Sequence, residues 1–163
     1  MMTHYRLPLL GTLAMLLAAC GNPNTSSVTQ EATQTPDPCI ASNMNLTIKP
    51  VNDLQREFND ASELAANLPR EQLQPTIADM QRIRREAEDQ TVPACLETLK
   101  RYQLAHMNSG IETLLAFVGG ADADTLSQGM TRARIEYDQY TFEMARLIGV
   151  TLIPATETFT PAP

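Results

Sequence analysis

Histidine, cysteine and methionine are the residue types in this chain that could bind a metal or a haem group. His106 is the one histidine that follows the N-terminal apolar segment, and the sequence holds 3 cysteines and 8 methionines. It contains no Cys-x-x-Cys-His motif for covalent attachment of haem. It also lacks the Glu-x-x-His pairs that di-iron bundles place on facing helices. We therefore predict no metal and no other cofactor.

Carboxylates and nucleophiles show no catalytic arrangement either. Two acidic turns, at residues 86–89 and 122–124, fall at the expected ends of helices, where carboxylates cap the backbone or face water. No serine or cysteine has a histidine partner in a recognised catalytic motif. The sequence therefore predicts a protein that is not an enzyme.

A small ligand pocket is the alternative use for the residues around His106. Gly110 lies in the middle of an expected helix, where glycine costs roughly 1 kcal/mol relative to alanine. It either permits close packing under Met130 or leaves a gap beside His106. The second interpretation gives a candidate pocket for a small ligand, a haem or a metal, formed by His106, Met107, Gly110, Met130, Tyr137 and Tyr140.

The N-terminus has the pattern of an export signal. Arg6 precedes an apolar run at residues 7–19. This run has about 13 residues, whereas a helix that spans a membrane needs roughly 20. The junction Leu17-Ala18-Ala19-Cys20-Gly21 resembles the lipobox of bacterial lipoproteins. The resemblance covers residues 1–21 and implies that signal peptidase II cuts before Cys20 after this cysteine has been lipidated.

The resemblance also implies a location. A lipid anchor on Cys20 would hold the mature protein at a membrane, outside the cytoplasm. Gly21 is not the aspartate that retains lipoproteins at the inner membrane in some bacteria with two membranes, so inner and outer membranes both remain open.

If Cys20 carries the lipid, Cys39 and Cys95 are the two remaining cysteines, and they lie in an oxidising compartment. A disulfide is therefore predicted between them. It would close a loop of about 57 residues and stabilise the fold by roughly 4 kcal/mol in the chain-entropy model. A zinc site would need further ligands nearby, and a redox motif would need Cys-x-x-Cys. Neither feature is present in the sequence.

Composition narrows the choice of partners. The chain has 19 acidic and 12 basic residues, a net charge of −7 and no tryptophan. Nucleic acid and anionic membrane surfaces are therefore not expected as partners. Arg82, Arg84 and Arg85 are followed at once by acidic residues, which favours a solvated helix face of mixed charge. We expect attachment to the membrane through the anchor on Cys20 and, as partner, another protein of the cell envelope.

Helical periodicity predicts the elements that position these residues. Apolar side chains follow the 3.6-residue period in four segments, and Gly119-Gly120 ends the third. Asp122 or Asp124 can cap the fourth helix, and Gly149 can end it. The strongest stripe is formed by Leu126, Met130, Ala133, Tyr137, Tyr140, Met144 and Leu147.

Short connections between four amphipathic helices predict an all-α, up-down-up-down four-helix bundle. The chain then divides into a signal peptide (1–19), a lipid-anchored flexible linker with the first disulfide cysteine (20–47), the bundle (48–149) and a disordered polar tail (150–163). We therefore predict a non-catalytic protein-interaction or structural module of the cell envelope, with the pocket around His106 as the alternative.

The bundle topology agrees with the predicted disulfide. The first and third helices run in the same direction, so Cys39 and Cys95 lie at the same end. Folding about residues 119–121 predicts that Gln103 faces Tyr137 as a buried hydrogen-bonded pair. The same register places Gly110 opposite Met130.

Overall fold

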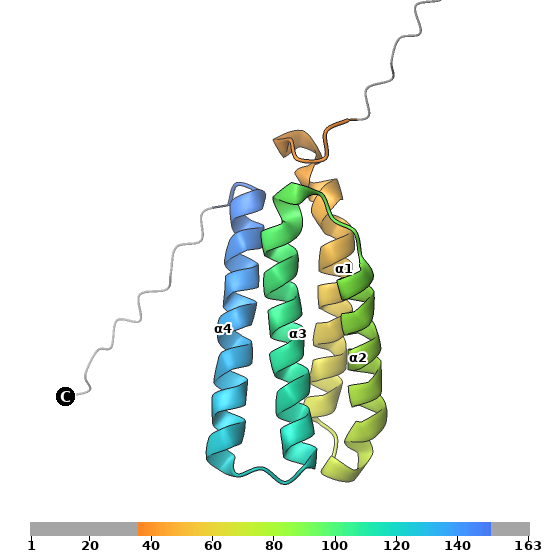
Figure 1. The fold of residues 1–163 in the computed structure, drawn as a ribbon, viewed down its shortest axis with the longest axis vertical. Helices are drawn as coiled ribbons and strands as arrows, with labels where there is room; N and C mark the ends of the chain where they lie inside the picture. The colour runs from red at the N-terminus through yellow and green to blue at the C-terminus, as the bar shows by residue number, and fades with distance from the viewer. Residues whose placement is uncertain (1–35, 151–163) are drawn as a thin grey trace, which may run out of the picture. The chain divides into compact units, whose positions relative to one another are not determined.

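Four helices, each antiparallel to the next, form the part of the chain that the computed structural model describes, residues 36–150 (Figure 1). The predicted all-α, up-down-up-down bundle is confirmed. The predicted signal peptide, Cys20, most of the predicted linker and the predicted tail after Val150 lie outside the described residues. The elements are α1 (Ala41–Ala66), η1 (Arg70–Gln72), α2 (Leu73–Asp89), η2 (Ala94–Leu96), α3 (Glu97–Val118) and α4 (Ala123–Leu147).

None of the helices within residues 36–150 is long and apolar enough to cross a lipid bilayer.

Helix α1 begins at Ala41, earlier than the predicted boundary at residue 48, so the end of the predicted linker is helical. Pro50 lies inside this helix, although proline in a helix interior costs about 3 kcal/mol. Met44 and Ile48 explain the early start, because both are buried on the same side as Val51. Their packing offsets the missing backbone hydrogen bond at the proline.

The other helix ends follow the predicted local signals. Asp122 caps α4, and its Oδ1 accepts a hydrogen bond of 2.8 Å from the amide of Thr125. Gly120 and Gly149, which follow α3 and α4, have φ values of 82° and 74°. Glycine adopts this left-handed conformation without the steric penalty that a Cβ introduces.

The predicted disulfide between Cys39 and Cys95 is present, with its Cα atoms 5.9 Å apart. It joins the segment before α1 to η2, at the start of α3. Both cysteines therefore lie at one end of the bundle, as the topology predicted.

A layer of buried amides divides the core into two apolar clusters. Gln55 and Gln103 lie within this layer, and Gln103 is fully buried. Towards the disulfide, the first cluster contains Met44, Ile48, Val51, Leu96, Leu99 and Tyr140. On the other side, the second contains Phe58, Ala61, Ala65, Leu73, Ile77, Met80, Ile83, Ala87, Met107 and Ile111.

The predicted pairing of Gln103 with Tyr137 is wrong. Nε2 of Gln103 donates a hydrogen bond of 2.7 Å to the backbone oxygen of Val51, on α1. Because α3 packs against all three other helices, it needs more than one contact face. Gln103 lies on the face toward α1, whereas His106, three positions later, faces α4.

Helix α4 packs mainly along α3 and touches α1 over a short stretch. Its contact face carries small residues at Gly129 and Ala133, which let the two backbones approach closely. Met130 is therefore turned outward and is 60% exposed, and Tyr137 is 37% exposed. The apolar stripe predicted on α4 is therefore not a continuous core face, because Tyr140 is its one buried residue.

Candidate functional site

An apolar groove lies between α1, α3 and α4, with Met80 of α2 at its base. Its volume is about 430 Å³. Ligand pockets commonly have volumes of roughly 300–1,000 Å³ and predominantly apolar walls. The walls carry no charged side chain at neutral pH. They are formed by Phe58, Ser62, Ala66, Met80, His106, Gly110, Thr113, Leu114, Phe117, Leu126, Met130 and Ala133.

Two polar contacts between α1 and α4 lie next to the groove. The amide nitrogen of the Asn59 side chain donates to the hydroxyl oxygen of Tyr137 at 3.4 Å. Further along, the hydroxyl of Tyr140 donates to Oδ1 of Asn52 at 3.3 Å. These contacts hold the two helices together on the side of the groove that is nearer to the disulfide.

His106 is the most polar residue of the groove wall. Its Nδ1 lies 2.9 Å from the backbone oxygen of Ala133. A carbonyl oxygen can only accept a hydrogen bond, so Nδ1 carries the hydrogen and Nε2 is the acceptor nitrogen of the neutral ring. The imidazole lies between two aromatic rings, with centroid distances of 5.6 Å to Phe58 and 5.0 Å to Tyr137.

The charge of His106 follows from its surroundings. Burial lowers the pKa of the imidazole, while the hydrogen bond to Ala133 and the negative charge of Glu136 act in the opposite direction. The net shift is downward, because a partly buried ring loses part of the hydration of its charged form. His106 is therefore neutral at neutral pH.

Two hydroxyl groups complete the polar part of the wall. Ser62 donates its hydroxyl hydrogen to the backbone oxygen of Phe58 at 2.9 Å. Thr113 donates in the same way to the backbone oxygen of Ser109 at 2.7 Å. Both hydrogens are thus used within their own helices. The oxygen lone pairs remain, so toward a further partner these two hydroxyls can act only as acceptors.

Three of the six residues of the predicted pocket line this groove, namely His106, Gly110 and Met130. Met107 is fully buried in the core instead. Tyr137 contacts the ring of His106 but does not line the groove, and Tyr140 belongs to the cluster near the disulfide.

Gly110 borders the groove and is not packed under Met130. A Cβ atom built on Gly110 would lie 3.4 Å from Cζ of Phe58, and no atom of Met130 would lie within 4 Å of it. The interpretation of Gly110 as a close contact with Met130 is therefore wrong. The close contact occurs at Gly129, where a Cβ would lie 2.4 Å from Oγ1 of Thr113.

The sequence did not predict that α1 forms a wall of the groove through Ser62 and Ala66. The helical period shows that these positions follow Phe58 at about one and two turns. It does not show that α4 lies across from them, so no signal in the sequence could identify this wall as part of a groove.

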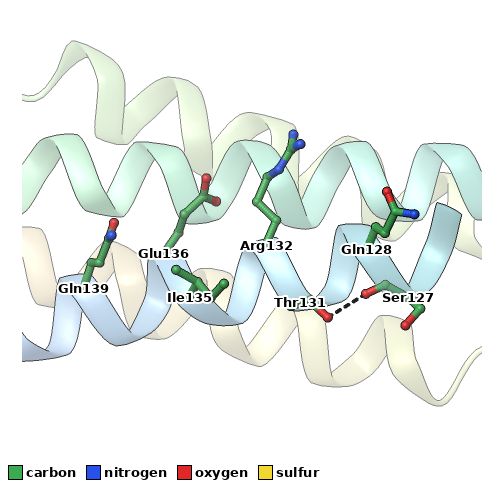
Figure 2. A pocket seen from close by; sticks show the side chains of 7 residues that line it. All are labelled: Ser127, Gln128, Thr131, Arg132, Ile135, Glu136 and Gln139. Carbon is green, nitrogen blue, oxygen red and sulfur yellow. Dashed lines mark hydrogen bonds between the residues drawn. The ribbon is translucent and has the colours of Figure 1, made fainter. Parts of the chain in front are cut away.

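A second hollow, of about 490 Å³, lies along α4 (Figure 2). All seven of its side chains belong to this single helix, and the hydroxyl of Thr131 donates to the backbone oxygen of Ser127 at 2.8 Å. A hollow formed by the side chains of one helix has no opposing wall that could enclose a ligand. The groove is the better candidate.

The arginine cluster of α2 forms the mixed-charge surface that the sequence predicted. Arg82 makes ion pairs with Glu57 at 2.7 Å, Asp79 at 2.8 Å and Glu86 at 2.6 Å. Hydrogen bonds to these three carboxylates, that to Glu57 first, raise the pKa of the guanidinium. Because its charge is already neutralised by acidic neighbours, Arg82 does not form an anion-binding site.

Possible metal ligands are dispersed over the structure. Within residues 36–150, no three side chains of histidine, cysteine, aspartate or glutamate come together as a group that could hold a metal ion. Comparisons of the whole chain with models of protein families, with curated proteins and with solved structures find no match.

Proposed function

We propose that this protein is a lipid-anchored, non-catalytic binding protein of the cell envelope, and that its groove takes up a small apolar ligand. The apolar groove between α1, α3 and α4 is the observation that supports this proposal. It opens about 430 Å³ among apolar side chains of three helices, and its wall includes one imidazole, that of His106, whose Nε2 is the acceptor nitrogen of the neutral ring. A ligand that covers these walls gains roughly 25 cal/mol for each Å² of apolar surface removed from water.

The anchor and the location are supported by two features of the chain. The junction around Cys20 resembles a lipobox. The disulfide between Cys39 and Cys95 suits an oxidising compartment outside the cytoplasm. In this arrangement the polar segment after Cys20 serves as a tether between the lipid and the bundle.

Replacement of Cys20 tests the anchor. Cys20→Ala removes the thiol that would carry the lipid, so we expect the protein either to leave the membrane fraction or to keep its signal peptide uncut. Cell fractionation and the mass of the N-terminal fragment measure this, with the unaltered protein treated with globomycin as the control. Processing of Cys20→Ala that remains sensitive to globomycin would contradict the anchor.

Filling the groove tests the binding site. The probe is N-phenyl-1-naphthylamine, an uncharged apolar dye that fluoresces more strongly when it leaves water. Ala66 is an exposed residue at the rim, so Ala66→Phe narrows the groove without entering the core. We expect this change to weaken dye binding by about tenfold, which corresponds to about 1.4 kcal/mol.

Ala78→Phe is the matched control, because Ala78 is an exposed residue of α2 that does not line the groove. This variant should bind the dye as the unaltered protein does. Absence of saturable binding to the unaltered protein, or equal binding by the two variants, would refute the proposed site.

An interaction module for another envelope protein is the second candidate function. Ile135 and Phe142 favour it, since they lie one heptad apart on α4 and are 53% and 52% exposed. Neighbouring apolar side chains on an exposed helix face are a common feature of surfaces that bind proteins.

A further inference from the structure

We infer that the ligand of the groove is an uncharged apolar molecule with one hydrogen-bond donor, a hydroxyl or N–H group, which binds Nε2 of His106. This inference rests on the proposed function, because it names the class of ligand for the same groove. The inference follows from which atoms of the groove wall donate hydrogen bonds and which accept them.

The groove offers acceptors to a ligand. The hydrogen on Nδ1 of His106 is bound to the backbone oxygen of Ala133, which leaves Nε2 with its lone pair. The hydroxyl hydrogens of Ser62 and Thr113 are bound to backbone oxygens of their own helices. A ligand group that only accepts, such as a ketone or an ether, would meet no donor here and would lose its hydrogen bonds to water.

Among the three acceptors, Nε2 of His106 is the strongest. The hydroxyl of Thr113 is pressed against Gly129, where a Cβ would lie only 2.4 Å from Oγ1. This contact shields the oxygen from a ligand. The Ser62 hydroxyl already donates a hydrogen bond to the backbone of its own helix. The imidazole nitrogen is the more basic acceptor of the two.

Charge excludes two further classes of ligand. None of the twelve lining residues is acidic, lysine or arginine, and His106 is neutral at neutral pH. A carboxylate or an ammonium group in the groove would therefore lose its hydration without gaining an opposite charge. Acidic lipids and cationic amphiphiles should bind less tightly than neutral molecules of the same length.

The experiment compares 1-dodecanol with its methyl ether, which has the same chain but no donor. Each displaces N-phenyl-1-naphthylamine from the whole mature protein at pH 7.5. A net hydrogen bond of about 1 kcal/mol predicts that the alcohol binds about fivefold more tightly than the ether. Dodecanoate should be the weakest of the three.

His106→Phe removes the acceptor and keeps an aromatic ring between Phe58 and Tyr137. We expect the fivefold ratio of alcohol to ether to fall to about one, while the affinity for the ether is retained. Retained ether affinity shows that the groove is intact. Ala78→Phe, outside the groove, is the control and should keep the fivefold ratio. Ser62→Ala tests the other exposed acceptor of the wall.

A measurement on the unaltered protein covers the case in which His106→Phe does not fold. The ¹⁵N resonance of Nε2 should shift upfield when 1-dodecanol binds and should stay in place when the ether binds, because only the alcohol donates a hydrogen bond to this nitrogen.

Two kinds of failure are distinguishable. If the dye does not bind, or Ala66→Phe leaves its binding unchanged, the proposed function fails. If Ala66→Phe blocks binding but the alcohol has no advantage, or keeps its advantage in His106→Phe, only the inference about the donor and His106 is overturned. Loss of the advantage in Ser62→Ala alone would assign the acceptor to Ser62 and would equally overturn it.

Discussion

Reduction of the disulfide between Cys39 and Cys95 is expected to lower the free energy of unfolding by about 4 kcal/mol, because the bridge restricts the unfolded chain. The two cysteines are 56 positions apart in the sequence and 5.9 Å apart between Cα atoms. A loop of this length loses much entropy when it is closed in the unfolded state. The native helices keep their apolar contacts after reduction, so the bundle should remain helical.

Urea unfolding in the presence and absence of reductant measures this effect, and far-ultraviolet circular dichroism reports the helix content. The double variant Cys39→Ser and Cys95→Ser is the control, since reductant should have no effect on it. We also expect amide exchange to increase at the start of α1, where Met44 and Ile48 pack near the bridge. Two free thiols in protein purified without reductant, or unchanged stability after reduction, would contradict the prediction.

Gly129→Ala is expected to destabilise the bundle by about 1–3 kcal/mol through overpacking, although alanine is the better helix former. The new Cβ would lie 2.4 Å from Oγ1, 3.1 Å from Cγ2 and 3.2 Å from Cβ of Thr113. Threonine is branched at Cβ, so a rotation about χ1 does not remove all of these contacts. Helices α3 and α4 must therefore move apart.

Gly110→Ala is the matched control for this prediction. The added Cβ would meet the Phe58 ring at 3.4 Å, which is an ordinary contact, so the gain in helix propensity of about 1 kcal/mol should be retained. The two variants are compared by urea unfolding. The combination of Gly129→Ala with Thr113→Ala should recover part of the loss, because it removes the atoms in conflict. If both glycine variants are equally stable, the close contact at Gly129 is refuted.

Features that depend on neighbours in the sequence were determined by the sequence alone. The periods of the four helices, the cap at Asp122, the left-handed glycine at Gly149 and the topology of the bundle all follow from residues within a few turns of one another. The pairing of Cys39 with Cys95 followed from the cysteine count and from that topology. The early start of α1 was not predicted, because Pro50 is locally unfavourable inside a helix. Tertiary packing outweighs this local cost.

The candidate groove depends on the tertiary structure and could not be predicted from the sequence. A glycine and a lone histidine are unusual in an apolar helix, so the sequence marks Gly110 and His106 as candidate site residues. Their neighbours, Phe58 and Ala133, come from helices that the chain reaches tens of residues earlier or later. A helical period defines which residues share a face but not which helix covers that face. For this reason the sequence pattern predicts that Gln103 faces α4, whereas it bonds α1. The same pattern predicts a close glycine contact at Gly110, whereas this contact lies at Gly129.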